Sequence, residues 1–160
     1  MRKKLRIVGA VLLGLVAVVL GVGLVLPGEW RVARSVTVDA RPEIVFWFVS
    51  TLDGWNDWTA WVKKEDPSLT VTPAAGPATG VGMAYAWDSK ASGAGTFTLT
   101  ESVPPARVAY DLRFTDADIL LHGSFVLAPA GAGTSVTWTE VGDIGHNPVA
   151  RWMGVLFAGD

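Results

Sequence analysis

The sequence predicts an α+β protein, with one transmembrane helix at its N-terminus followed by an antiparallel sheet of six to seven strands and a few short helices. Three observations predict this. Residues 7–26 contain no charged or polar side chain. Residues 36–61 change from a period of two to a helical period. Between residues 69 and 139, segments in which apolar and polar residues alternate are separated by turns rich in Gly and Pro.

The apolar run at residues 7–26 is the strongest single signal in the sequence. As a helix it would be about 30 Å long, the hydrocarbon thickness of a bilayer. Four basic residues precede it and three follow closely, which favours a cytoplasmic N-terminus. A cleaved signal peptide is the alternative, although its apolar region usually has only about 7–15 residues. We therefore expect residues 1–27 to be an uncleaved signal anchor and residues 28–160 to be one extracytoplasmic domain.

Small residues form a stripe along one side of the predicted anchor helix. Such stripes allow two helices to approach closely, so a homodimer through the anchor is one possible assembly. A helix rich in Ala, Gly and Val would also carry such spacings by composition alone. The sequence has no cysteine, which excludes a disulfide framework and a lipid-modified cysteine. The residues of the stripe are Ala10, Gly14, Ala17 and Gly21.

The stretch at residues 36–61 predicts a strand followed by two small helices. Apolar and polar residues alternate at its start, as in a half-buried strand. A first helix should begin at Pro42, because proline suits the first helical turn, and should end at Asp53 and Gly54. A second short helix should follow, with tryptophans three residues apart along one side. These are Trp55, Trp58 and Trp61.

Further strands and a last helix follow. The alternating segments lie at residues 69–72, 83–87, 96–100, 108–114, 119–127 and 136–139. Short turns join most of them, which is typical of an antiparallel sheet. The last helix should begin with Asn147 as its N-cap and Pro148 in its first turn. Its apolar face would be formed by Val149, Trp152, Met153 and Leu156.

The order of these elements resembles the START-like (SRPBCC) superfamily, near its polyketide cyclase/dehydrase-type members. The strand, helix pair and Trp-rich turn of residues 36–61 carry this resemblance, and two later elements support it. One is the turn and strand at residues 76–87, with glycines at 76, 80 and 82 before Tyr85 and Trp87. The other is the strand end at residues 100–102.

The resemblance implies a helix-grip fold. In that family two small helices close one end of a curved antiparallel sheet, and a long C-terminal helix lies across the sheet. The fold implies a cavity for an apolar ligand. Here the sequence ends at Asp160, about one to two turns into the apolar face of the last helix. We therefore expect an incomplete C-terminal helix. Either the chain is a fragment, which is the interpretation we favour, or the short helix leaves the cavity unusually open.

The inward faces of the strands and the Trp-rich helix supply the candidate cavity residues. A plain hydrophobic core has the same composition as a cavity lining, so the two interpretations are separated here only by the family resemblance. The candidates are Trp58, Tyr85, Trp87, Phe97, Leu99, Tyr110, Leu112, Phe125 and Trp138.

Chemical motifs are scarce. The sequence has no nucleophile elbow, P-loop, dinucleotide fingerprint or zinc-site spacing, so we expect neither a cofactor nor a metal. Glu101, Glu140 and Tyr110 are weak catalytic candidates, because a carboxylate at the end of an inward face can have a raised pKa. Solvated carboxylates at the sheet rim and a tyrosine bonded to backbone are the alternatives. Strand parity places His122 on the outer face, and His146 falls in a loop.

Charge and composition limit the partners. Beyond the anchor, nine basic residues stand against fifteen acidic ones, and no basic patch with interleaved aromatics is present, which argues against nucleic acid binding. The sequence therefore predicts a membrane-anchored domain that binds a small apolar or lipid-like molecule, with no established catalysis. Two alternatives stay open: a polyketide cyclase/dehydrase-type enzyme, and a non-catalytic interaction domain dimerised through its anchor.

Overall fold

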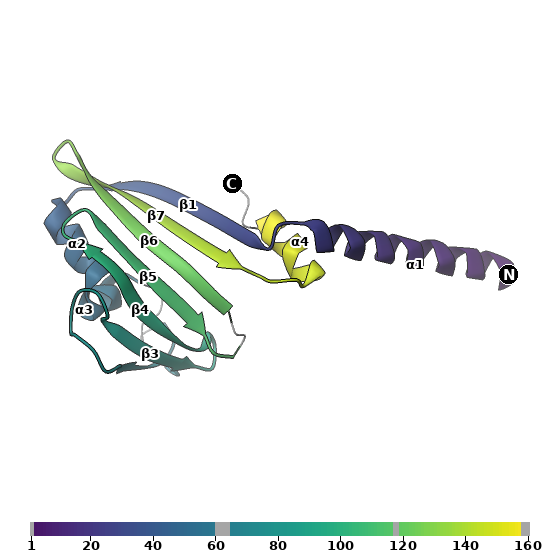
Figure 1. The fold of residues 1–160 in the computed structure, drawn as a ribbon, viewed down its shortest axis with the longest axis horizontal. Helices are drawn as coiled ribbons and strands as arrows, with labels where there is room; N and C mark the ends of the chain where they lie inside the picture. Colours follow the sequence, from purple (N-terminus) through teal and green to yellow (C-terminus); the bar gives the residue numbers. More distant parts are fainter. Residues whose placement is uncertain (1, 60–64, 117–118, 158–160) are drawn as a thin grey trace. The chain divides into compact units, whose positions relative to one another are not determined.

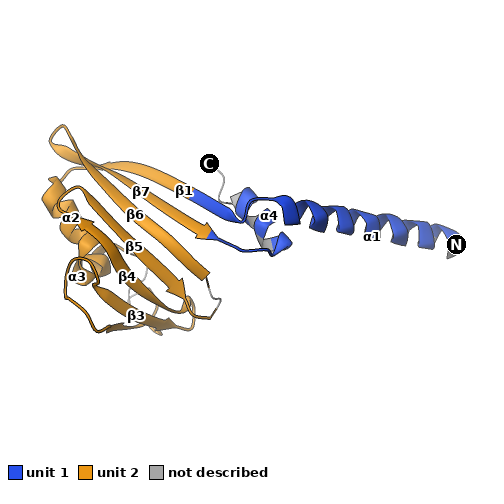
Figure 2. Ribbon diagram, viewed as in Figure 1, with its two compact units in different colours: residues 1–31, 143–160 blue, residues 32–142 orange. Residues whose placement is uncertain are grey.

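The computed structural model describes residues 2–59, 65–116 and 119–157. The chain divides into two compact units (Figure 2). Unit 1 contains residues 1–31 and 143–160, and unit 2 contains residues 32–142.

Unit 1 contains two helices, α1 (Arg2–Val25) and α4 (Pro148–Phe157), which pack against each other. Within the described residues, α1 is the one helix long and apolar enough to cross a membrane, and its candidate span is Arg6–Val25. Most of its side chains are exposed. The resemblance implies a last helix that lies across the sheet; in the structure that helix packs against α1.

Unit 2 contains two small helices and most of a curved, seven-stranded antiparallel sheet (Figure 1). The strand order is β1-β7-β6-β5-β4-β3-β2. The helices are α2 (Pro42–Ser50) and α3 (Leu52–Trp58), and α2 packs over β5 and β6. The strands are β1 (Glu29–Val38), β2 (Thr70–Pro73), β3 (Ala84–Ser89), β4 (Gly93–Val103), β5 (Arg107–Phe114), β6 (Ile119–Ala130) and β7 (Gly133–Asp143).

The strands confirm the predicted alternation. In β5 the side chains of Val108, Tyr110 and Leu112 are buried, while those between them are less so. One face of the sheet therefore packs into the core and the other meets solvent. Several strands are longer than their alternating segments predict, and β1 begins seven residues before Val36, at Glu29.

The predicted end of the first helix is wrong. α2 ends at Ser50, and Asp53 and Gly54 lie inside α3. Thr51 separates the helices because its side chain caps α3: its hydroxyl accepts a hydrogen bond from the Gly54 amide at 3.0 Å. Gly54 lets the two helices approach closely, since a Cβ there would lie 2.6 Å from the Phe48 Cα. Trp61 lies outside the described residues.

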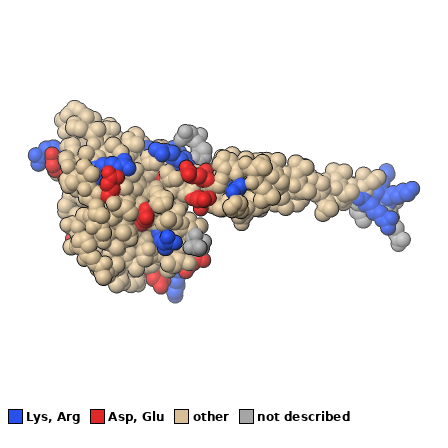
Figure 3. All heavy atoms as spheres, in the orientation of Figure 1, with Lys and Arg blue, Asp and Glu red and all other residues tan. Residues whose placement is uncertain are grey.

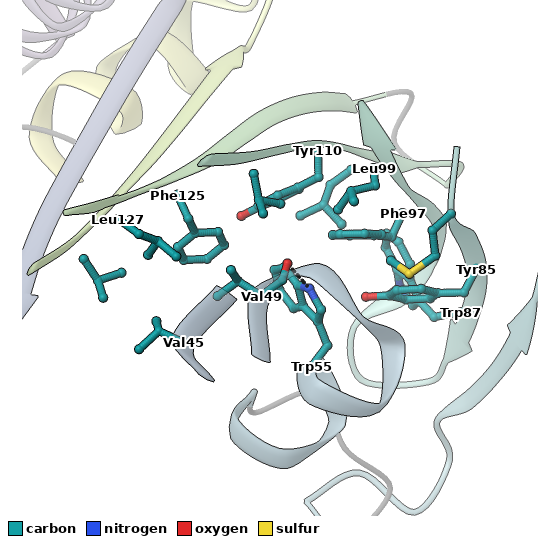
Figure 4. Close-up of a cluster of buried hydrophobic side chains, with 14 of the residues drawn as sticks. Val45, Val49, Trp55, Tyr85, Trp87, Phe97, Leu99, Tyr110, Phe125 and Leu127 are labelled. Atoms are coloured by element: carbon teal, nitrogen blue, oxygen red, sulfur yellow. Dashed lines mark hydrogen bonds between the residues drawn. The ribbon is translucent and has the colours of Figure 1, made fainter. Parts of the chain in front are cut away.

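Aromatic rings dominate the core of unit 2 (Figure 4). Four rings from β3 to β6 follow one another across the sheet, with centroids 4.9 Å, 5.0 Å and 5.9 Å apart. Trp55 of α3 contacts three of them edge-on, and its indole N–H donates to the Val49 carbonyl at 2.9 Å. Offset and edge-to-face contacts stabilise such clusters beyond simple burial. The four rings are Tyr85, Phe97, Tyr110 and Phe125.

Candidate functional site

An apolar pocket of about 380 Å³ lies in unit 2, between β1, α2 and the inward face of β6 and β7. This volume is within the range of small-molecule sites. The wall formed by β1 and the turn after it consists of Arg34, Ser35, Val36, Val38 and Ala40. The wall formed by α2 consists of Ile44, Val45, Phe48 and Val49. The remaining lining residues are Trp58, Phe125, Val136 and Trp138.

Side-chain size explains where the pocket lies. Each strand from β3 to β6 carries at least one aromatic ring at an inward position, and these rings fill the space under the helices. Towards β1 the inward positions carry the smaller Val36, Val38 and Val136, and Ala40 follows the strand. Interiors normally pack without large voids, so the space left beside these residues is a specific feature of this end of the sheet.

The pocket is open and mostly apolar. Large apolar side chains around it stay exposed, including Val36, Ile44, Trp58 and Trp138. An exposed apolar cluster of this kind is typical of an interaction site. Its two polar residues are neighbours on β1: the Ser35 hydroxyl lies 2.9 Å from that of Thr137, and Arg34 donates to the Ala33 carbonyl at 2.9 Å.

Next to the pocket, a partly buried polar cluster spans three neighbouring strands. Tyr110 of β5 lies opposite Gly123 of β6, which lies opposite Glu140 of β7. The Tyr110 hydroxyl donates to Glu140 Oε1 across β6. The indole N–H of Trp138 donates to the Tyr110 hydroxyl at 2.8 Å and to Glu140 Oε1 at 3.2 Å. Trp138 therefore belongs both to the pocket and to this cluster.

Gly123 makes this arrangement possible. A Cβ at this position would collide with the distal atoms of the Tyr110 ring, so no other residue allows the ring to cross β6 unchanged. Tyr110 and Glu140 are separate candidates in the sequence, and only the strand register shows that they meet.

Burial sets the protonation of the cluster. Desolvation raises the pKa of Glu140, and the hydrogen bonds from Tyr110 and Trp138 oppose this shift only in part. Desolvation and the nearby Glu140 also raise the pKa of Tyr110. Glu140 Oε2 is buried and has no hydrogen-bond partner among the described residues. A neutral carboxyl tolerates an unpartnered oxygen better than a carboxylate does, which agrees with the raised pKa.

The other titratable candidates lie elsewhere. Glu101 forms a 2.7 Å ion pair with Arg107, and both side chains are about two-fifths exposed, as expected for a solvated rim carboxylate. His122 lies on the outer face, as strand parity predicts, with its Nδ1 2.7 Å from Asp111 Oδ1. His146 is exposed. Among the described residues, no group of three His, Asp or Glu side chains is placed to hold a metal ion.

Three of the nine predicted cavity residues line the pocket: Trp58, Phe125 and Trp138. The other six are buried in the core: Tyr85, Trp87, Phe97, Leu99, Tyr110 and Leu112. Tyr85 and Trp87 also border a cavity of about 10 Å³, which has room for no more than about one water. Sequence reasoning missed the residues of β1, the turn after it and α2, which together form most of the lining. Their signal was available, since Val36 and Val38 alternate along β1 and Val45 and Val49 share a face of α2.

A curved antiparallel sheet that holds two small helices and an apolar pocket on its inner face defines a helix-grip protein. Solved structures agree. The chain is similar to the protein Mll3558 from Rhizobium loti, with 19% identity, 79% of this chain and 90% of that chain covered, and a TM-score of 0.56. It is also similar to the protein CV1439 from Chromobacterium violaceum, with 23% identity, coverage of 82% and 93%, and a TM-score of 0.52. A third similar structure is that of the Aha1 dimer from Colwellia psychrerythraea, at 18% identity, coverage of 79% and 90%, and a TM-score of 0.53.

The family follows from the sequence match. The model of the polyketide cyclase/dehydrase and lipid transport family matches residues 29–159, and the chain belongs to this family. A comparison with curated proteins gives no significant match.

Proposed function

We propose that this chain is a membrane-anchored carrier or receptor whose helix-grip domain binds a small apolar or lipid-like molecule in the pocket between β1 and α2. The observation that carries this proposal is the pocket itself, whose lining is apolar apart from Arg34 and Ser35. Burying an apolar molecule there would stabilise the complex by about 25 cal/mol for each Å² removed from water. The family, named for lipid transport as well as for cyclases and dehydrases, supports the same ligand class.

The proposal includes anchoring by α1 as an uncleaved signal anchor, with the N-terminus cytoplasmic and unit 2 extracytoplasmic. Its support is the apolar length of α1 and the basic residues before it. Figure 3 shows these basic side chains gathered at the N-terminal end of α1, with uncharged residues along most of the helix.

Filling the pocket tests the binding proposal. Val38 lines the pocket and is 37% exposed, so Val38→Trp should place an indole in it at little cost to folding. Val126 is outside the pocket and 42% exposed, which makes Val126→Trp a matched control. With the full chain in detergent and a fluorescent fatty-acid analogue as the probe, we expect Val38→Trp to weaken binding by at least about tenfold, or about 1.4 kcal/mol. Equal affinities for the two variants and the wild type would place the ligand elsewhere.

The second candidate function is a cyclase/dehydrase-type enzyme. The Tyr110 and Glu140 pair favours it, because a carboxyl with a raised pKa beside a ligand pocket can serve as a general acid. Neither residue lines the pocket, however, and the Trp138 indole that bonds to both does. For this reason we place binding first. Loss of turnover in Tyr110→Phe, with ligand affinity retained, would favour the enzyme.

We also propose that two copies of the chain can dimerise through α1. The residues of the small-residue stripe are exposed, and a Cβ at Gly14 or Gly21 would meet no atom within 4 Å. That side of α1 is therefore open to a second helix within the described part of the chain. Cross-linking of the full chain in membranes, with Gly14→Leu and Gly21→Leu as the disrupting variants, would decide whether a dimer forms.

A further inference from the structure

The short helix α4 crosses the C-terminal end of α1 within unit 1. Its first residue, Pro148, packs against Gly23, where a Cβ would lie only 2.6 Å from the Pro148 carbonyl oxygen. The indole N–H of Trp152 donates to the Val19 carbonyl at 2.9 Å. The contact is specific to Gly23, because a Cβ added at Gly9, Gly14 or Gly21 would meet no atom within 4 Å.

Hydrogen bonds from Arg151 join α4 to the C-terminal end of α1. Its Nη1 donates to the carbonyls of Leu24 and Leu26 at 2.6 Å and 2.9 Å, and its Nε donates to the Gly145 carbonyl at 2.6 Å. The last carbonyls of a helix lack partners within that helix and carry partial negative charge. A guanidinium supplies both the missing hydrogen-bond donors and a positive charge. Arg151 is the one charged residue in the sequence of α4, and its charge is directed towards α1.

The outward side chains of α4 are apolar. Val149 is 59% exposed, Val155 47% and Leu156 67%. Val155 also borders a cleft of about 260 Å³ shared with Pro27 and Trp30, directly after the candidate span. Thus α4 lies at the level where the span ends, together with two tryptophans and an arginine, the residue types that gather at the boundary between lipid and water.

We propose that α4 is an interfacial helix that lies in the membrane surface on the domain side of the span, with Val149, Val155 and Leu156 in contact with lipid acyl chains. This inference rests on the proposed anchoring by α1. Helices that bind at the interface bury an apolar face to a depth of about 5–10 Å. The packing of α4 on the last turns of α1 holds α4 at that depth. The Trp152 indole N–H donates to the Val19 carbonyl, a hydrogen bond that lipid acyl chains could not provide.

The absence of cysteine from the sequence permits a direct test. Single cysteines are introduced into the full chain by Leu156→Cys on α4, Val16→Cys in the span and Val126→Cys on β6, all at exposed positions. Each is labelled with an environment-sensitive fluorophore and reconstituted into phosphatidylcholine and phosphatidylglycerol vesicles that contain spin-labelled lipid. We expect fluorescence loss at Leu156 and Val16 and none at Val126. Val155→Cys provides a second position on α4.

The outcomes separate the inference from the anchoring on which it rests. Quenching at Val16 without quenching at Leu156 and Val155 would leave the anchor in place and overturn the interfacial helix. In that case, protection of Leu156 from a water-soluble maleimide would assign its apolar face to a protein partner. Absence of quenching at Val16 as well would overturn the anchoring itself.

Discussion

At the scale of single residues, the contact between Tyr110 and Glu140 depends on a residue that takes no part in it. Gly123 leaves room for the Tyr110 ring to pass over β6. We expect Gly123→Ala to lower the free energy of unfolding by about 1–3 kcal/mol, the usual cost of overpacking a filled core. Denaturant unfolding of the full chain in detergent measures this.

A double-mutant cycle shows whether the Tyr110 ring causes the destabilisation by Gly123→Ala. Tyr110→Phe keeps the ring, so Gly123→Ala should cost as much in that background as in the wild type. Tyr110→Leu removes the distal ring atoms, and there the cost of Gly123→Ala should fall, giving a coupling of about 0.5–3 kcal/mol. The same cost in all three backgrounds would show that Gly123 is needed for another reason.

Glu140 gives the protein a pH dependence whose sign follows from its burial. Because desolvation raises its pKa in the folded state above the ordinary value of 4.5, the folded state holds this proton more tightly than the unfolded state. The stabilisation from the neutral carboxyl is fully present below about pH 4.5 and is lost as the pH rises through the raised pKa. The stability of Glu140→Gln relative to the wild type should therefore improve from pH 4 to pH 8, as measured by unfolding at several pH values.

The variant His122→Gln is the control for the predicted pH dependence of Glu140. The charge of His122 lowers the pKa of Glu140, in opposition to desolvation, and His122 pairs with Asp111 on the outer face. His122→Gln should leave the pH dependence attributed to Glu140 in place or enlarge it. A stability difference between Glu140→Gln and the wild type that does not change with pH would contradict the assignment.

At the scale of elements, the break between α2 and α3 depends on the Thr51 side chain. It accepts from the Gly54 amide at 3.0 Å and donates to the Trp47 carbonyl at 2.9 Å. We expect Thr51→Ala to reduce the free energy of unfolding by about 0.5–2 kcal/mol, the usual cost of losing an N-cap. Thr51→Ser keeps the hydroxyl and should recover most of this loss; equal destabilisation by both variants would argue against the cap.

The same break shows what local patterns can and cannot predict. Alternation located β3 to β7 because the sheet has one buried and one solvated face. The boundary of α2 was misplaced because Asp53 and Gly54 are typical of helix ends, whereas here Gly54 is required inside α3 by its close approach to Phe48. That requirement is a tertiary contact, and no local pattern contains it.

At the scale of the whole molecule, the sequence predicted the fold better than it predicted the pocket. The inward residues of β3 to β7 were identified correctly as one apolar face, yet Phe97 and Leu99 are fully buried in the core, where Phe97 packs against Trp55 of α3. Core and lining have the same composition, so the difference arises only from which side chains fill the space. The valines of β1 leave space because they are small.

The last helix shows the same limit. Its apolar face predicted a buried surface, and the family resemblance supplied the sheet as its partner. In the structure the helix contacts α1 through Arg151, Trp152 and the packing of Pro148 on Gly23. Val149 and Leu156 of the predicted face stay exposed. An apolar helical face predicts burial but does not identify the surface that covers it.

The most direct test of the binding proposal is native mass spectrometry of the full chain, purified from membranes in mild detergent, for the wild type, Val38→Trp and Val126→Trp. We predict that the wild type and Val126→Trp carry a bound apolar molecule, identifiable after solvent extraction, and that Val38→Trp is empty. A wild-type protein that is folded, free of ligand and indifferent to an added panel of lipids would contradict the account. A molecule retained equally by Val38→Trp would show that it is not held in this pocket.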